Sequence, residues 1–180
     1  MEHIDRIREQ LPAPVRDLQL NLQSVLQGGA LDDKQRWGVA VACAMSAGST
    51  RLRDAVLTDA KAIVGDNVID DARAAAALMA MNNVFYRFKH MVGKGGYEQR
   101  PARLRMSRIA QPSTDKVTFE LMCLAVSAIN GCEVCIKSHE HAVIEGGLTE
   151  EHVQDAIRIA ATMRGAAVAI ENTESFDQKG

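Results

Sequence analysis

Two cysteines and one histidine in the segment 130–139 are the residues whose types and spacing best suit chemistry. Cys132 and Cys135 are three residues apart, and His139 follows four residues after Cys135. On a helix, spacings of three and four place side chains on one face, so two thiols and an imidazole would share one site. A thiol beside a base, with a second thiol in reach, is suited to reversible disulfide chemistry. The same side chains are also suited to binding a metal ion, so both interpretations are open at this point.

The surroundings of the two cysteines predict different roles for them. Asn130 and Gly131 break the chain just before Cys132, and a helix that begins there would lower the pKa of this thiol, because unpaired N–H groups favour the thiolate. His139, however, lies one helical turn after Cys135, and proton removal needs a base within hydrogen-bond reach. We therefore predict that Cys135 is the attacking thiolate and that Cys132 is the resolving thiol and proton donor.

Glu120 is a further candidate for the same site. It lies twelve residues before Cys132, at the start of the apolar run 121–126. A carboxylate at this position is either exposed or buried with a partner. Buried beside His139, it would orient the imidazole and stabilise its charged form. The alternative is an ordinary surface glutamate, and the residues alone leave both interpretations open.

The composition of the 180-residue chain predicts one helical domain. Hydrophobic residues make up 47% of the chain and aromatic residues 4%, so alanine, aliphatic residues and methionine must form the core, which favours helices over sheets. The formal net charge of -2 gives no basic surface for nucleic acid. With no visible signal peptide and no apolar run long enough to cross a bilayer, we expect a cytoplasmic protein without a membrane partner. Structural disulfides are rare in that compartment, so a close cysteine pair suggests catalysis or metal binding.

Helical patterns extend along the whole chain, and no window alternates in the manner of a strand. A glycine-rich loop is expected at 92–100 and a short turn at 104–109. We expect helices at about residues 14–27, 32–47, 51–64, 70–91, 112–129, 132–145 and from 150 onward.

The two halves of the chain resemble each other, which predicts a degenerate internal repeat. Lys34 and Trp37 match Lys116 and Phe119 at an offset of 82 residues. The acidic pair 70–71 matches the pair 150–151 at an offset of 80 residues. We therefore predict an all-α fold, a single domain over residues 1–180 built from a degenerate internal helical repeat.

Only one of the two predicted halves carries the candidate chemistry. The degenerate N-terminal half covers about residues 30–92, and the active C-terminal half covers about 113–171. At the positions of Glu120, Cys132, Cys135 and His139, the N-terminal half has Gly38, Thr50, Arg53 and Leu57. We therefore interpret the first half as a scaffold for the second.

The four candidate residues together resemble the motif of a known family. Glu120, an eleven-residue gap, Cys132-x-x-Cys135 and then x-x-x-His139 are similar to the motif of the AhpD-type alkyl hydroperoxidases, in the carboxymuconolactone decarboxylase superfamily. The resemblance is specific over residues 114–164, and it agrees with the length of the chain and with an all-helical duplicated fold.

The resemblance implies an activity, partners and residue roles. It implies a homotrimeric peroxidase that reduces organic hydroperoxides, recycles a partner peroxiredoxin and holds no bound cofactor, with a lipoyl-type dithiol on a lipoyl-bearing protein as external reductant. In this family the glutamate and histidine relay protons, the second cysteine forms the sulfenic acid and the mixed disulfide, and the first cysteine donates a proton. These roles would transfer to Glu120, His139, Cys135 and Cys132. Some members have a histidine directly before the second cysteine, and this chain has Val134 there.

Other functions stay open beside the peroxidase. A disulfide reductase or electron carrier would use the same cysteine pair with little direct peroxide turnover. A zinc-binding protein would use Cys132, Cys135 and His139, with Glu120 or a water as the fourth ligand. A helical interaction module would need no catalytic cysteine. Haem attachment is excluded, because Ile136 and not histidine follows Cys135.

The remaining residues of chemical interest are expected to be structural. Cys43 and Cys123 lie in apolar runs and should be core residues. The loop residues 94–96 lack the rest of a phosphate-binding motif. The remaining histidines are interpreted as flanking or surface residues: His3, His90, His141 and His152. Several methionines are expected to pack in the core, and some of them to line a pocket for an apolar peroxide tail: Met79, Met81, Met91 and Met163.

Overall fold

The alanine-rich and aliphatic runs of the chain form helices, with no strand among residues 1–177, the part that this computed structural model describes. The helices, in chain order, are α1 (Glu2–Gln10), the 3-10 turn η1 (Ala13–Val15), α2 (Arg16–Gln27), α3 (Asp33–Ser46), α4 (Thr50–Lys61), α5 (Asp66–Val92), α6 (Gly95–Glu98), α7 (Ser107–Ala110), α8 (Lys116–Ile129), α9 (Glu133–Glu145) and α10 (Glu150–Asp177). The all-α prediction is thus confirmed. None of the described helices is both long enough and apolar enough to cross a membrane.

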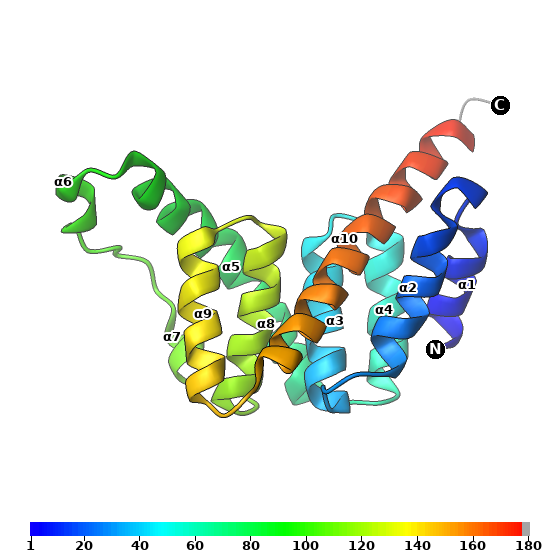
Figure 1. Ribbon diagram of the computed structural model, residues 1–180, viewed down its shortest axis with the longest axis horizontal. Helices are drawn as coiled ribbons and strands as arrows, with labels where there is room; N and C mark the ends of the chain where they lie inside the picture. The colour runs from blue at the N-terminus through cyan, green and yellow to red at the C-terminus, as the bar shows by residue number, and fades with distance from the viewer. Residues whose placement is uncertain (178–180) are drawn as a thin grey trace.

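The helices α3 and α8 form the centre of the fold. Residues 36–44 of α3 and 118–127 of α8 are buried without interruption, as expected for helices that are covered on all sides. Both helices pack against α5 and α10. Figure 1 shows α8 and α9 side by side toward one end of the molecule, α1, α2 and α4 toward the other, and α10 crossing between them. The helix α9 packs against α5 and α8.

Several helix ends differ from the predictions for identifiable reasons. The helix expected from residue 112 begins at Lys116, because the Asp115 side chain caps it by accepting a hydrogen bond from the backbone N–H of Thr118. The helix expected from residue 70 begins at Asp66, and the one expected to reach residue 64 ends at Lys61. The expected loop at 92–100 contains the single turn α6.

The helix α1 was not predicted from the sequence. Ile4 and Ile7 are its buried residues, and α1 packs against α4. Asp59 of α4 accepts hydrogen bonds from the backbone N–H groups of His3 and Ile4, which would otherwise be unpaired at the start of the helix. This helix is therefore capped by a residue more than fifty positions away, which local patterns do not reveal.

The helix lengths agree with the predicted repeat. The helices α3, α4 and α5 have 14, 12 and 27 residues, and α8, α9 and α10 have 14, 13 and 28. Each trio consists of two shorter helices followed by a long one. The boundaries of the two halves and their origin by duplication stay predictions.

Candidate active site

A tight turn between α8 and α9 places the cysteine pair. Gly131 has φ 65°, in the left-handed region that favours glycine. Its backbone N–H donates to the carbonyl of Ala128 at 3.2 Å, and the N–H of Cys132 donates to the carbonyl of Ser127 at 3.1 Å. These two bonds are those of a Schellman motif, which ends a helix and turns the chain sharply. Cys132 therefore stands at the N-cap of α9, as expected from the Asn130–Gly131 break.

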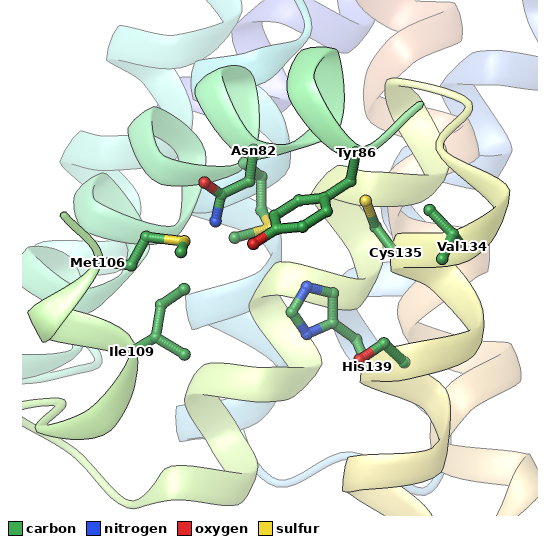
Figure 2. Close-up of a pocket in the computed structure, with 9 residues that line it drawn as sticks. Asn82, Tyr86, Met106, Ile109, Val134, Cys135 and His139 are labelled. Carbon is green, nitrogen blue, oxygen red and sulfur yellow. The ribbon is translucent and has the colours of Figure 1, made fainter. Parts of the chain in front are cut away.

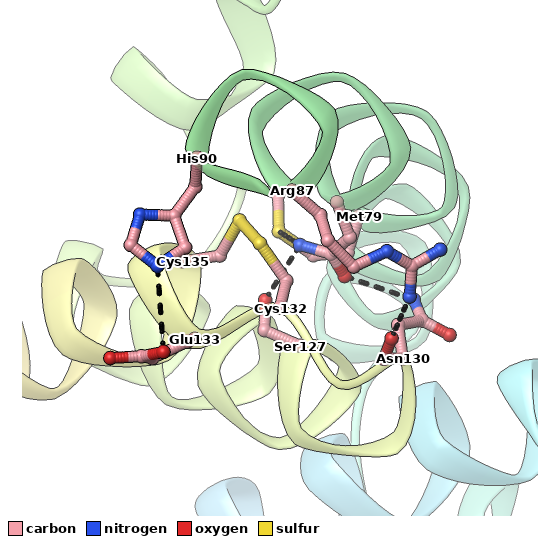
Figure 3. The surroundings of a disulfide bond; sticks show 9 residues. Met79, Arg87, His90, Ser127, Asn130, Cys132, Glu133 and Cys135 are labelled. Carbon is pink, nitrogen blue, oxygen red and sulfur yellow. Dashed lines mark hydrogen bonds and ion pairs between the residues drawn. A yellow bond between two sulfur atoms is a disulfide. The ribbon is translucent and has the colours of Figure 1, made fainter. Parts of the chain in front are cut away.

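Polar side chains of α5 form hydrogen bonds that hold this turn in place (Figure 3). Asn83 donates to the Ser127 hydroxyl at 3.0 Å and accepts from the Asn130 side chain at 2.9 Å. Arg87 donates to the Asn130 carbonyl. Both halves of the Asn83 amide are therefore paired, and the turn that carries Cys132 is tied to α5 by side chains as well as by packing.

The two cysteines form a disulfide and differ in access. Cys132 and Cys135 are bonded, with Cα atoms 5.3 Å apart. Cys132 is 0% exposed and Cys135 is 7% exposed, and Cys135 lines a cavity. An external thiol must reach a sulfur to exchange with it, so Cys135 is the more accessible point of attack.

Glu120 and His139 form a buried pair beside the disulfide. The Glu120 Oε2 atom lies 2.5 Å from His139 Nδ1, and Oε1 lies 2.5 Å from Lys116 Nζ. Burial raises the pKa of the Glu120 carboxyl, but the hydrogen bonds and charges of His139 and Lys116 outweigh burial and hold this pKa below its usual value. An ionised carboxylate only accepts, so Nδ1 must carry the proton. In the neutral imidazole, Nε2 is then the atom that can accept a proton.

A cavity of about 380 Å³ opens between α5, α9 and the segment around α7. Figure 2 shows Asn82 and Tyr86 of α5 approaching it from one side and His139 of α9 from another. Met106 and Ile109 bound the cavity opposite α9. Its complete lining consists of Met79, Asn82, Tyr86, Met106, Ile109, Val134, Cys135, Ser138 and His139. The cavity thus combines one sulfur of the disulfide, the imidazole and several apolar side chains.

Asp71 fixes the cavity wall formed by Met106 and Ile109. Its side chain is 0% exposed and accepts hydrogen bonds from the backbone N–H groups of residues 113–114, while Arg108 of α7 lies 2.7 Å from its Oδ1. Burial raises the pKa of this carboxyl, but the hydrogen bonds from the Thr114 hydroxyl and from these N–H groups, together with the Arg108 charge, outweigh burial and hold the pKa below its usual value. Because Arg108 lies between the two wall residues in the chain, this pair anchors them beside α5.

Comparisons with known proteins agree with this geometry. The model of the carboxymuconolactone decarboxylase family matches residues 96–172. The alkyl hydroperoxide reductase AhpD of Anaeromyxobacter sp. (strain K) is 59% identical over 171 residues, which cover 95% of this chain and 92% of that protein. The chain belongs to the AhpD family. Proteins of the same name from Solibacter usitatus and Brucella canis are 45% and 41% identical, over 93% and 96% of this chain and 95% and 98% of their own lengths.

Membership of the AhpD family confirms the resemblance that was based on four residues. The structure brings these residues together: His139 contacts Glu120 and lines the same cavity as Cys135, and Cys135 is bonded to Cys132. The alternative that Glu120 is an exposed surface residue is wrong, because it is 6% exposed. Val134 borders the cavity and is 38% exposed.

The metal interpretation has less geometric support. Within residues 1–177, no group of three or more histidine, cysteine, aspartate or glutamate side chains is arranged to hold a metal ion. Metal analysis of the purified protein tests the zinc alternative.

The expectations for the other cysteines and methionines are partly confirmed. Cys43 and Cys123 are both free and fully buried, and burial raises the pKa of each thiol. Met163 is a core residue, and Met79 is buried and also lines the cavity, as a pocket for an apolar tail would require. The core assignment of Met91 is wrong, because it lies near the C-terminal end of α5 and is 77% exposed.

The other histidines lie outside the cavity lining. The side chains of His90 and His141 are 51% and 72% exposed, and they form ion pairs with glutamates at the surface. His3 and His152 are only partly exposed, and His3 contacts Asp59. None of them lines the cavity that holds Cys135.

Sequence reasoning missed several residues of the site, among them Lys116, Asn82 and Tyr86. Lys116 contacts Glu120 at a spacing of four residues, which is a helical ion-pair signal that the sequence does contain. Asn82 and Tyr86 line the cavity from α5, about fifty residues before Cys135. No local pattern marks these two residues, because they reach the site only through the packing of α5 against α9.

Proposed function

We propose that this chain is a thiol peroxidase that reduces organic hydroperoxides through the Cys132–Cys135 pair. The observation that carries the proposal is that Cys135 and His139 line one cavity with apolar walls, while buried Glu120 holds the imidazole. The name of the AhpD relatives, alkyl hydroperoxide reductase, supports the same activity. An oxidoreductase of this kind removes peroxides and acts as an antioxidant, and we keep the expected cytoplasmic location, where reductants are available, as part of the proposal.

The first half of the cycle oxidises the reduced cysteine pair. His139 takes the proton of the Cys135 thiol, and the thiolate attacks the terminal oxygen of the hydroperoxide. The S–O bond forms, the O–O bond breaks, and the alkoxide takes the proton of the Cys132 thiol and leaves as an alcohol. Cys135 is then a sulfenic acid. The Cys132 thiolate attacks it, the hydroxyl group takes the proton from His139 and leaves as water, and the disulfide of this structure results.

Glu120 acts through the imidazole. Its carboxylate accepts the Nδ1–H of His139 and thereby fixes the tautomer in which Nε2 accepts the proton. When Nε2 takes that proton, the imidazole becomes positively charged beside a buried carboxylate, which stabilises the charge. The relay proposed for this chain therefore runs from Cys135 to His139 with Glu120 behind it, and Val134 takes no part.

An external dithiol completes the cycle. A thiolate of the reductant attacks Cys135, the more exposed sulfur, and Cys132 leaves as a thiolate that then takes a proton. The second thiol of the reductant attacks the mixed disulfide, which releases Cys135 and a cyclic disulfide. A lipoyl group on a carrier protein is the reductant that the family resemblance implies, and the same dithiol chemistry would let this chain recycle a peroxiredoxin.

Self-association is a further part of the proposal. Val84, Phe88 and Met91 are 61%, 48% and 77% exposed at spacings of four and three, so they share one face at the end of α5. The Phe88 ring meets Tyr97 edge-on, with centroids 5.4 Å apart. An apolar face of this kind supports association between copies, and the family resemblance implies a homotrimer, which sedimentation at several concentrations would test.

The proposed activity predicts dithiol-dependent turnover of an organic hydroperoxide. Purified protein supplied with dihydrolipoamide should consume cumene hydroperoxide over many cycles and release one cumyl alcohol for each hydroperoxide. An electron carrier would instead oxidise dihydrolipoamide with a disulfide acceptor and leave the hydroperoxide almost untouched. Metal analysis of protein purified without chelator belongs to the same experiment, because stoichiometric zinc together with absent turnover would contradict the proposal.

A further inference from the structure

We propose that the Asn82 side chain binds the peroxide group of the substrate, with the apolar part of an organic hydroperoxide against Met106 and Ile109. This inference rests on the proposed function and deepens it by assigning a substrate-binding residue on α5. It goes beyond the four motif residues, all of which lie in α8, in α9 or in the turn between them.

The pairing of the Asn82 amide is incomplete. Asn82 is 4% exposed, and within residues 1–177 no protein group donates a hydrogen bond to its Oδ1 atom. A buried amide oxygen without a donor is costly, so such an atom needs an explanation. The neighbouring Asn83 is equally buried, but its amide donates to Ser127 and accepts from Asn130. The two adjacent asparagines therefore differ: Asn83 is structural, and Asn82 has hydrogen-bonding capacity to spare.

This unpaired amide belongs to the lining of the cavity that contains Cys135 and His139. In Figure 2 the Asn82 amide extends from α5 toward the space between Met106 and the Tyr86 hydroxyl, with its nitrogen nearer to this space than its oxygen. The His139 imidazole points into the same space from α9. An amide on α5 and a base on α9 thus approach one volume from two different helices.

The chemistry of the lining fits an organic hydroperoxide. Such a molecule, R–O–O–H, has one hydroxyl that must donate, oxygens that accept, and an apolar carbon group. The Asn82 amide offers one acceptor and two donors. Nδ2 can donate to a peroxide oxygen, and the fully buried Oδ1 can accept the O–H after the amide turns about its Cβ–Cγ bond. The cavity volume of about 380 Å³ lies in the lower part of the range of small-molecule sites, which is about 300–1,000 Å³.

The wall that faces the carbon group is held in place. Arg108, between Met106 and Ile109, is paired with the fully buried Asp71. Lys116 reaches both Glu120 and the carbonyl of Ile109, so the same wall is also tied to the buried relay. An apolar surface fixed in this way favours hydroperoxides that carry an alkyl or aryl group over hydrogen peroxide, which has no group to place there.

The test separates the two half-reactions in Asn82→Leu, which keeps the approximate side-chain shape and removes the amide. Prereduced protein should lose thiols to cumene hydroperoxide about tenfold to a hundredfold more slowly than wild type, because one hydrogen-bonded contact is lost. Reduction of its disulfide by dihydrolipoamide should stay within about twofold of wild type, since that step uses the Cys135 sulfur and not the amide. Asn82→Ala, which removes the amide without adding an apolar group, should give the same split.

The matched control is Asn67→Leu, the same substitution at an exposed position of α5, and both of its half-reactions should match wild type. Equal oxidation rates in wild type and both Asn82 variants would overturn the role of Asn82 and leave the proposed function intact. A parallel loss in both half-reactions would show a merely structural role and would also overturn it. If wild-type thiols fail to react with cumene hydroperoxide, the proposed function itself is wrong, and the inference falls with it.

Discussion

Cys135→Ser is expected to lower dihydrolipoamide-dependent turnover of cumene hydroperoxide by at least about a thousandfold. A serine hydroxyl stays protonated near neutral pH and cannot form a sulfenic acid or a disulfide, so both half-reactions stop at this position. Turnover is measured as hydroperoxide consumed and alcohol formed under saturating dithiol. The matched control is Cys43→Ala, which removes a free, buried cysteine that is not part of the cavity lining and should keep turnover near the wild-type rate.

The companion variant Cys132→Ser separates the roles of the two cysteines. It retains Cys135, so one equivalent of hydroperoxide should still be reduced, but the sulfenic acid then has no resolving thiol beside it. A sulfenic acid reagent should label this variant at Cys135 after one equivalent of hydroperoxide. If Cys132→Ser fails to react while Cys135→Ser still reduces its first equivalent, the assignment of nucleophile and resolving thiol is reversed.

Glu120→Gln is expected to lower the rate of thiol oxidation by hydroperoxide about a hundredfold or more. The substitution keeps the shape of the side chain but removes the charge that stabilises the imidazolium and fixes the Nδ1–H tautomer of His139. The measurement is the single-turnover rate of thiol loss at neutral pH. The matched control is Glu145→Gln, which changes another Glu–His pair of the same region. The partner of Glu145 is His141, and the side chains of His141 and Glu145 are 72% and 69% exposed. This control should react like wild type.

The charge of Glu120 also predicts the direction of a pH effect on stability. The pKa of Glu120 is lowered in the folded chain, so the unfolded chain binds more protons in acid. The stabilising contribution of the carboxylate is therefore complete above about pH 5 and is lost as the pH falls below about 4, near the usual glutamate pKa. The difference in free energy of unfolding between wild type and Glu120→Gln should shrink over that range. A difference that grows on acidification would contradict the pairing with His139 and Lys116.

The candidate residues could be found from the sequence because they depend on local geometry. The helix α9 and its N-cap hold Cys132, Cys135 and His139 at spacings of three and four. Glu120 lies in the preceding helix, α8. Two helices that are joined by a short break can pack against each other over such a distance. A buried contact between Glu120 and His139 was therefore a reasonable alternative to an exposed glutamate. The glycine that makes the turn possible, Gly131, is also visible in the sequence.

The rest of the site could not be found in this way, because it depends on contacts between distant segments. Asn82 and Tyr86 are ordinary residues of a long helix until α5 packs against α9. Asp71, which the sequence offered only as part of a repeated acidic pair, is a buried anchor for residues about forty positions later. Met91 illustrates the opposite error, a residue wrongly assigned to the core. Its apolar side chain suggested the core, but its place near the end of α5 leaves it exposed.

The most direct test of the central claim is a single turnover of fully reduced wild-type protein with one equivalent of cumene hydroperoxide. We predict that two thiols are lost for each alcohol formed and that peptide mapping finds the new disulfide between Cys132 and Cys135. Cys43 and Cys123 should remain free thiols. Alcohol formation without loss of the Cys132 and Cys135 thiols, or no reaction with the hydroperoxide, would contradict a peroxidase that works through this pair.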